Sequence, residues 1–237
     1  GDGEVMDAAE LLEELRVYLT GRGASLVACA DIQAIPSELR DDFPRALLIA
    51  VALTPSIVAG ISSGPTFEYL REYKRVNALL TSLAEDAAEY LQKAGWQAKA
   101  YLPSKGGAAN EGLRTPLPHK TVATLSGAGW IGRCALLVTE RFGSALRINR
   151  VLTDAPLTAG EPVTESLCGA CFECVRACPA GAPQGGAWTP GMNREELFDA
   201  FACRDKAINL CPEEWDVRSI CGICIQACPH TRRYLVR

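Results

Sequence analysis

The chain has 237 residues, 48% of them hydrophobic, and its 24 basic and 28 acidic side chains give a formal charge of −4. This length allows one good core plus a small module, and the acidic balance argues against a nucleic-acid partner, because phosphate binding requires concentrated positive charge. No apolar run approaches the roughly 20 residues that span a bilayer, and no basic region precedes an apolar stretch at the amino terminus, so we expect a soluble, cytoplasmic protein with no membrane partner.

The first 160 residues alternate between helical and strand patterns. Apolar residues three and four positions apart predict amphipathic helices over 4–19 and 67–94. The continuously apolar run 46–53 is typical of a strand buried on both faces. The other predicted elements are strands over 25–29, 96–102, 135–139 and 145–152 and a helical turn over 119–125.

Residues 103–118 are rich in proline and glycine, which predicts a long loop. A loop of this length is either functional or a plain surface excursion. The order of elements predicts an α/β (α+β) fold, with a layered mixed sheet and helices in a domain over 1–160. A ferredoxin-like domain with two 4Fe-4S clusters is predicted over 161–237.

Nine of the eleven cysteines follow Ser166, and seven of these nine fall into two runs. The first run has the spacing C-x2-C-x2-C-x3-C-P, and the second repeats its end as C-x2-C-x3-C-P. In two-cluster ferredoxins the first three cysteines of a run bind one cluster, and the cysteine before the proline binds the other. The predicted sets are Cys168, Cys171, Cys174 and Cys228 for one cluster, and Cys178, Cys221, Cys224 and one upstream cysteine for the second.

The upstream ligand is either Cys203 or Cys211. We favour Cys203, because residues 194–202 have a helical pattern that could deliver it, whereas Cys211 is followed by Pro212. Disulfides would fit a secreted chain with an even number of cysteines, whereas this chain has eleven. The cysteine count therefore argues against disulfides. Zinc gives no reason for the third cysteine of the first run or for the paired C-P endings.

Residues 127–132 read G-A-G-W-I-G and satisfy the dinucleotide-binding pattern G-x-G-x-x-G. That fingerprint requires a preceding strand and a helix that opens at the glycines. Here a predicted helix precedes the glycines and a predicted strand follows them, so we exclude a dinucleotide-binding site at this turn. The three glycines Gly127, Gly129 and Gly132 either let the backbone approach a large cofactor or serve tight packing at a helix-to-strand turn.

Several of these segments together resemble the cobalamin-dependent epoxyqueuosine reductase family, which is related to reductive dehalogenases. They are His119-Lys120-Thr121, the glycine turn with Trp130, the stretch V-L-T-D-A-P-L over 151–157, and the two cysteine runs. The resemblance is dense from Leu117 to Pro229. It implies a cobalamin that receives electrons from two 4Fe-4S clusters. The cobalamin-contacting residues that it implies are His119, Lys120, Gly127, Gly129, Trp130 and Gly132, with the loop over 103–118 nearby.

The family has an acidic proton donor in a segment of pattern R-D-Y-H, and the matching residues are Arg71, Glu72, Tyr73 and Lys74. The resemblance implies that Glu72 donates the proton, with a pKa raised by shielding from water. In this segment Glu72 replaces the aspartate of the family pattern and Lys74 replaces its histidine, so the resemblance does not identify the substrate. The alternative is that Glu72 is an ordinary charge on the exposed face of a helix.

The sequence ends eight residues after Pro229, so we expect a short form that lacks the helical-repeat region with which family members hold tRNA. We therefore expect a reductase for a small electrophilic substrate, supplied with electrons by an external low-potential donor. One alternative is an electron-transfer protein that reductively activates the corrinoid of a partner enzyme. Another is a flavin-binding reductase.

Overall fold

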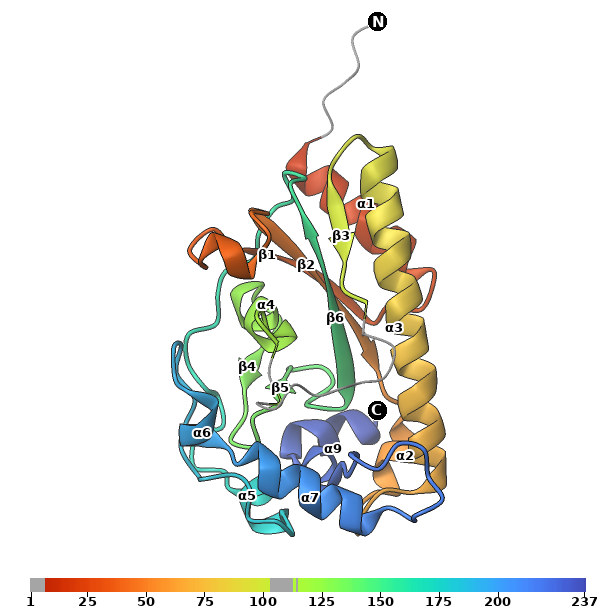
Figure 1. The fold of residues 1–237 in the computed structure, drawn as a ribbon, viewed down its shortest axis with the longest axis vertical. Helices are drawn as coiled ribbons and strands as arrows, with labels where there is room; N and C mark the ends of the chain where they lie inside the picture. The colour runs from red at the N-terminus through yellow and green to blue at the C-terminus, as the bar shows by residue number, and fades with distance from the viewer. Residues whose placement is uncertain (1–6, 103–112, 114) are drawn as a thin grey trace, which may run out of the picture. The chain divides into compact units, whose positions relative to one another are not determined.

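The computed structural model describes residues 7–102, 113 and 115–237 (Figure 1). The chain divides into two compact units, each assembled from three segments. The sheet unit consists of Gly1–Val51, Asn77–Ala128 and Arg147–Val163, and the cysteine unit of Ala52–Val76, Gly129–Leu146 and Thr164–Arg237. These units differ from the contiguous domains predicted over 1–160 and 161–237, because two segments from the first part of the chain pack with the cysteine-rich part.

The described elements include both helices and strands as far as β6 and are all helical after it. In chain order they are α1 (Ala8–Thr20), β1 (Leu26–Asp31), the 3-10 helix η1 (Ser37–Leu39), β2 (Arg45–Ala52), α2 (Pro55–Ala59), α3 (Phe67–Lys93), β3 (Ala98–Ala100), α4 (His119–Leu125), β4 (Trp130–Ile131), β5 (Leu137–Val138), β6 (Leu146–Thr153), α5 (Glu173–Ala177), α6 (Arg194–Leu197), α7 (Ala200–Leu210), α8 (Ile223–Ala227) and α9 (Pro229–Leu235).

The sheet unit is built on a four-stranded sheet in the order β1-β2-β6-β3. Strand β1 pairs antiparallel with β2, and β3 pairs antiparallel with β6. Each residue from Ala46 to Val51 in the inner strand β2 is at most 3% exposed, which confirms the predicted strand buried on both faces. The fold class is therefore mixed α/β, with antiparallel strand pairs.

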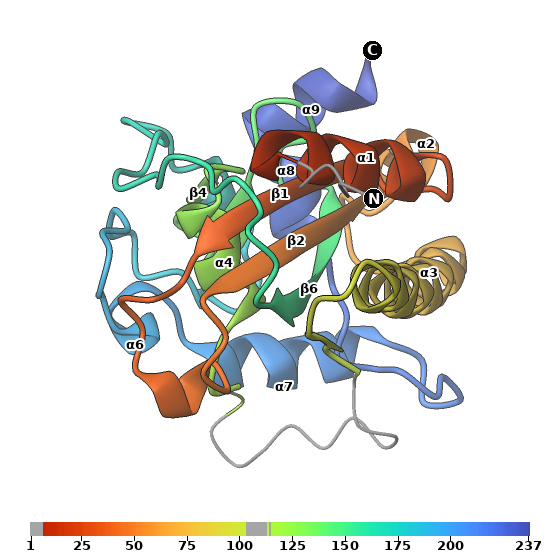
Figure 2. The ribbon, with the colours of Figure 1, turned by 90° about the horizontal axis from the view of Figure 1, so that it is seen from above.

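Helices cover the sheet because their apolar residues recur on one side. In α1 the buried residues are Leu11, Leu12, Leu15 and Leu19. Helices α1 and α3 lie side by side (Figure 2), and the Tyr90 hydroxyl donates to Glu14 at 3.0 Å. Because side chains alternate along β6, its residues contact helices on opposite faces. Asn149 donates to the Leu80 carbonyl in α3, and its neighbour Arg150 contacts α4.

Three predicted elements differ from the observed ones. The strands expected over 96–102 and 135–139 shorten to β3 and β5, and the helix expected over 194–202 is broken in two. The break lies at Phe198, whose backbone is extended. Asp199 then caps α7, because its carboxylate accepts hydrogen bonds from the backbone N–H groups of Phe201 and Ala202 at 3.0 and 2.9 Å. Phe198 itself bridges to Pro183.

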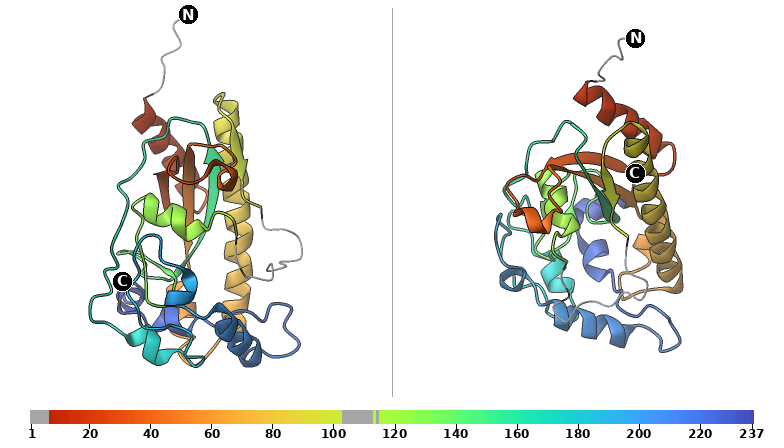
Figure 3. Two further views of the ribbon diagram at one scale, coloured as in Figure 1. Left: turned by 60° about the vertical axis from the view of Figure 1, so that its left-hand side comes forward. Right: turned by 45° about the horizontal axis from the view of Figure 1, so that its top comes forward.

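The cysteine unit consists of the hairpin β4–β5, the helix α2, the first part of α3 and the short helices from α5 onwards, which Figure 3 shows in cyan to blue. Helix α8 packs against both α5 and α9. It begins after Gly222, whose φ is +85° and whose missing side chain would meet Ile61 at 2.5 Å. Only glycine satisfies both constraints.

In the described part of the chain, no helix is both long enough and apolar enough to cross a membrane.

Candidate functional site

The eight predicted cluster ligands all belong to the cysteine unit. Each run contains a five-residue helix that ends directly before the cysteine of its C-P pair: α5 precedes Cys178, and α8 precedes Cys228. Because α5 and α8 pack against each other, the two runs lie together although about 50 residues separate them in the sequence.

Cysteines from different runs are neighbours in the folded unit. Cys228 lies close enough to Cys174 for the Cys174 sulfur to contribute to the raised pKa of Cys228. In the same way Cys203 is a neighbour of both Cys178 and Cys221. These are the pairings that crossed ligation requires, since the cysteine before each proline must meet the other run.

Three of the predicted ligands, Cys203, Cys221 and Cys228, have thiols that resist ionisation. Burial raises the pKa of Cys203 to about 11, and it also raises the pKa values of Cys221 and Cys228. A cation among the sulfurs would reverse this shift, because it stabilises thiolates. The described residues contain no group of three or more His, Cys, Asp or Glu side chains placed to hold one metal ion. A 4Fe-4S core distributes its four cysteines over four irons, so the donor set fits clusters.

The two candidates for the eighth ligand have different surroundings. Cys203 lies in the first turn of α7. Cys211 follows the end of α7, is 4% exposed, and donates its thiol to the Ile220 carbonyl at 3.4 Å. Cys211 is also a neighbour of Cys221. A satisfied thiol has a structural reason to be buried, which supports Cys203 as the ligand.

Arg133 is a residue that our sequence reasoning missed. Its guanidinium donates to three backbone carbonyls around the first run: Cys171 at 3.0 Å, Gly169 at 2.6 Å, and Gly185. It also stacks over the Phe172 ring, 4.2 Å from the centroid. Arg133 therefore anchors the β4–β5 hairpin to the cysteine loop. The feature of the sequence that could have identified Arg133 is a charged residue between apolar segments.

His119 lies at the start of α4 and is held neutral. Its Nδ1 accepts a hydrogen bond from Arg150 Nη1 at 3.0 Å, and its ring meets the Tyr101 ring edge-on at 4.7 Å. Burial, together with the positive charge of Arg150, lowers the pKa of His119 to about 3. Arg150 is 7% exposed, and its Nε has no hydrogen-bond partner among the described residues. The sequence signal for Arg150 was an arginine directly before the apolar residues Val151 and Leu152 of a predicted strand.

The three glycines of the turn have a packing explanation. A side chain at Gly127 would meet the Glu161 carbonyl at 2.7 Å, and one at Gly129 would meet the Val138 carbonyl at 2.1 Å. At Gly132 it would meet the Val138 side chain at 2.9 Å. Tight packing at the turn, the alternative that the sequence left open, therefore accounts for all three without a cofactor.

Trp130 has features expected of a residue that contacts a bound group. It is 2% exposed, packs edge-on against the His230 ring at 4.9 Å, and its Nε1 has no hydrogen-bond partner within the described ranges. A buried donor without an acceptor is costly, so a bound group that accepts from it would stabilise the fold. Lys120, the second residue of α4, belongs with His119 to the sheet unit, whereas Trp130 belongs to the cysteine unit.

The expectation of a raised pKa for Glu72 is wrong, and so is the alternative of an exposed position. The Glu72 side chain is 3% exposed, and its Oε1 accepts from the Thr54 backbone N–H and hydroxyl, both at 2.8 Å. Arg75 donates to both carboxylate oxygens, at 2.8 and 2.9 Å. Burial alone would raise the pKa of Glu72, but these hydrogen bonds outweigh it and lower the pKa. Glu72 is therefore a carboxylate at neutral pH that ties the start of α2 to α3.

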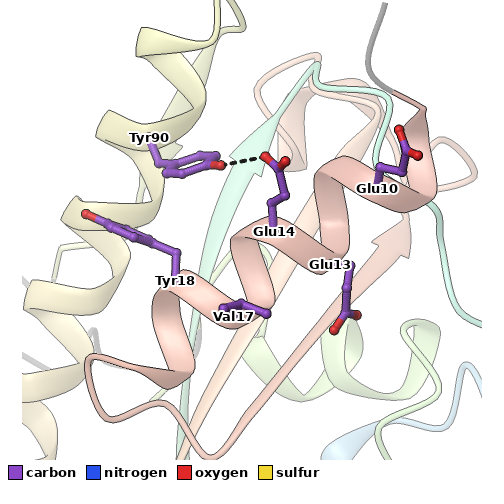
Figure 4. Close-up of a pocket in the computed structure, with 6 residues that line it drawn as sticks. All are labelled: Glu10, Glu13, Glu14, Val17, Tyr18 and Tyr90. Atoms are coloured by element: carbon purple, nitrogen blue, oxygen red, sulfur yellow. Dashed lines mark hydrogen bonds between the residues drawn. The ribbon is translucent and has the colours of Figure 1, made fainter.

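A shallow hollow of about 640 Å³ lies on the sheet unit between α1 and α3 (Figure 4). It is lined by Glu10, Glu13, Glu14, Val17, Tyr18 and Tyr90. None of the predicted ligands or cofactor residues lines it, so it has no part in the site. The predicted loop over 103–118 falls mostly outside the described residues.

No protein-family model matches the chain. It is 32% identical over 224 residues to the epoxyqueuosine reductase of Synechococcus sp. (strain CC9605), an alignment that covers 87% of this chain and 64% of that protein. It is 29% identical over 160 residues to the epoxyqueuosine reductase of Salmonella typhimurium (strain LT2), covering 64% of this chain and 38% of that protein. The chain thus spans less than two thirds of these relatives.

Among solved structures, a reductive dehalogenase described with a mechanism for B12-dependent dehalogenation matches 100% of this chain and 35% of its own, with a TM-score of 0.73 and 18% identity. A catabolic reductive dehalogenase in complex with 3-bromo-4-hydroxybenzoic acid has a TM-score of 0.74 and 16% identity, and covers 97% of this chain and 33% of its own. An epoxyqueuosine reductase with an epoxyqueuosine-modified tRNA stem loop has a TM-score of 0.61 and 17% identity, and covers 94% and 65%. These likenesses establish a shared fold.

The Glu72→Gln substitution should lower the free energy of unfolding at pH 7 by about 2 kcal/mol, because it removes a buried charge-assisted hydrogen-bond network. Since the folded-state pKa of Glu72 is lowered, its contribution is complete above the pKa of an unfolded glutamate and is lost as the pH falls through the folded pKa. Urea unfolding at several pH values measures this. Exposed Glu68→Gln is the control. Equal stability of Glu72→Gln and wild type at pH 7 would contradict the structural role.

The chain should lose stability on mild acidification through His119. An unfolded histidine takes up a proton near pH 6.5, whereas folded His119 stays neutral down to about pH 3. Its contribution is therefore complete above pH 6.5 and declines below it. Between pH 7.5 and 5 we expect wild type to lose about 2 kcal/mol more unfolding free energy than His119→Gln. Parallel pH profiles of the two proteins would show that His119 titrates normally.

Proposed function

Because the chain is a member of the epoxyqueuosine reductase family, we propose that it is an iron-sulfur reductase that passes electrons from two 4Fe-4S clusters to a bound cobalamin. The cobalamin would reduce a small electrophilic substrate, and an external low-potential donor would supply the electrons. The cysteine-rich part would be a ferredoxin-like domain, as the spacing of its cysteines predicts.

The observation that carries the proposal is the meeting of the two cysteine runs. Cys174 of the first run neighbours Cys228 of the second, and Cys178 neighbours Cys203 and Cys221. Eight thiols of this kind, brought together in one compact unit, are a donor set for iron rather than for disulfides. The raised thiol pKa values support this, because such a site is stable as thiolates only around a cationic core.

Cobalamin, when bound, would supply a low-valent cobalt that attacks or reduces the substrate. The residues proposed to hold it are His119, Lys120 and Trp130, with the backbone at Gly127, Gly129 and Gly132. Trp130 offers a buried N–H without an acceptor among the described residues. Neutral His119 can donate only through Nε2, because Nδ1 already accepts from Arg150.

Glu72 is a poor proton source as it is arranged here. A carboxylate with four hydrogen bonds and a lowered pKa would have to leave Thr54 and Arg75 before it took up a proton near pH 7. A catalytic role for Glu72 would therefore require movement of the start of α2. Without that movement, the proton would come from another group or from solvent.

A second function has one observation in its favour. The three glycines are closely packed against neighbouring residues of the chain, and His119 is already bonded to Arg150, so only part of the expected cofactor surface is free. This favours an electron-transfer protein that reduces the corrinoid of a partner enzyme. The two functions share the clusters and differ in which chain binds the corrinoid.

The eighth ligand can be identified from iron content. After anaerobic reconstitution, wild type should contain about eight irons for two clusters. Cys203→Ala should lose about half of them, because one cluster lacks a ligand, and Cys211→Ala should keep them all. Iron and acid-labile sulfide assays measure this. The opposite result would assign the ligand to Cys211, and wild type without iron would refute the clusters.

Corrinoid binding separates the two functions. Cobalamin added at micromolar concentration to the reconstituted protein should change its visible absorbance, and Trp130→Phe should weaken binding by about tenfold, through the loss of one hydrogen bond to a buried group. Trp188→Phe, a second tryptophan of the cysteine unit, is the control. Absence of binding by wild type would leave the electron-transfer function. Binding unchanged in Trp130→Phe would remove Trp130 from the site.

A further inference from the structure

Arg133 carries a positive charge into the interior of the cysteine unit. It lies in the turn between β4 and β5 and is 8% exposed. Its guanidinium donates to the backbone carbonyls of Gly169, Cys171 and Gly185. Within the described ranges, no carboxylate forms an ion pair with it. Because a guanidinium is not deprotonated in proteins, the charge is permanent, and its three acceptors are neutral.

A buried charge of this kind is unfavourable unless negative charge lies near it. Removing an ion from water is costly. The carbonyl dipoles and the ring of Phe172, 4.2 Å from the guanidinium carbon, offset only part of that cost. Buried charges in proteins are usually paired with an opposite charge or belong to a metal site. The surroundings of Arg133 therefore indicate that an anionic group belongs beside it.

The carbonyls that Arg133 binds indicate which group this is. Two of them, those of Gly169 and Cys171, lie inside the first cysteine run. The proposed cluster whose ligands include Cys168, Cys171 and Cys174 is called here the first-run cluster. An oxidised 4Fe-4S core with four thiolates has a net charge of about −2. The loop that Arg133 holds is thus the loop that would carry this negative charge.

We propose that Arg133 is a positioning residue that holds a permanent positive charge beside the first-run cluster and thereby raises its reduction potential. The inference rests on the proposed clusters. Reduction transfers one electron from the external donor and changes the net charge of the core and its thiolates from about −2 to about −3. A fixed cation stabilises the more negative state more strongly, and a low dielectric constant strengthens that effect.

The planar guanidinium explains why an arginine fits this position. It has five donors in a rigid fork, and it reaches Gly169 at 2.6 Å, Cys171 at 3.0 Å, and Gly185 while its face stacks on Phe172. A lysine would keep the charge but would bind fewer of these carbonyls, because its ammonium is a single point charge. Substitution can therefore separate the charge from the anchoring of the loop.

The test compares Arg133→Lys, which keeps the charge, with Arg133→Gln, which keeps amide donors and is neutral. Both are reconstituted anaerobically, assayed for iron and sulfide, and titrated with electron paramagnetic resonance as the readout. We expect unchanged iron content. Arg133→Gln should make reduction of one cluster about tenfold less favourable, a fall of about 60 mV at 59 mV per tenfold. Arg133→Lys should stay within about twofold of wild type, because its charge remains.

The matched control is Arg141→Gln. Arg141 belongs to the same unit and also stacks on an aromatic ring, that of Phe142 at 4.9 Å, but its side chain is exposed. Solvent and salt screen an exposed charge, so its removal should leave both potentials unchanged. An equal fall in Arg141→Gln would overturn the proposal by showing a general effect of charge. Equal potentials in Arg133→Lys and Arg133→Gln would also overturn it, because the charge of Arg133 would then have no effect.

The outcome stays decisive if Arg133→Gln fails to fold. Arg133→Met, which has an apolar side chain and avoids a buried polar group, then serves as the neutral variant, and a wild-type potential in it overturns the inference. If neither neutral variant holds iron, Arg133→Lys decides: a potential within about twofold of wild type supports the role of the charge, and a tenfold loss overturns it. Failure of the proposed function is distinguishable, because wild type would then bind no iron.

Discussion

Burial of thiols without a compensating positive charge is the constraint on which the cysteine unit depends. Placing several cysteines in a low-dielectric interior raises their pKa values, as seen for Cys203, Cys221 and Cys228. The same sulfurs become good thiolates once a cationic core lies among them. The proposed clusters would supply such a charge, so cluster loading and folding of this unit are expected to be linked.

The cysteine unit is not formed by the cysteine-rich segment alone. Lys74 from α3 forms an ion pair with Asp216 at 2.6 Å, and Tyr234 in α9 donates to the Leu53 carbonyl at 2.8 Å. The exposed ion pair adds little energy by itself. The buried contacts matter more: Gly222 fits against Ile61 and Tyr69, and Arg133 binds the cysteine loop. The segments Ala52–Val76 and Gly129–Leu146 thus help to shape the cysteine unit.

Polar groups inside the sheet unit show the opposite electrostatic arrangement. Arg150 brings a positive charge into a buried strand and is stabilised by the Tyr101 ring, 4.5 Å from its guanidinium carbon, and by the lone pair of His119. Burial and the charge of Arg150 in turn lower the pKa of His119, so His119 stays neutral. A similar balance in the cysteine unit keeps Glu72 ionised beside Arg75. In both places a neighbouring arginine decides the protonation state.

The sequence by itself determined the strongly periodic elements, the buried strand β2, the two cysteine runs and the family. These features follow from local spacing. An apolar stripe with helical period predicts a helix, and the spacing C-x2-C-x2-C-x3-C-P is typical of cysteines that bind iron-sulfur clusters. Only the tertiary structure decided the partners of single residues. It showed that Glu72 is a buried carboxylate, that the turn glycines are closely packed, and that Arg133 and Cys134 belong to the cysteine unit. Such partners lie up to 181 positions apart, as Tyr234 and Leu53 do, and no local pattern encodes a contact across that distance.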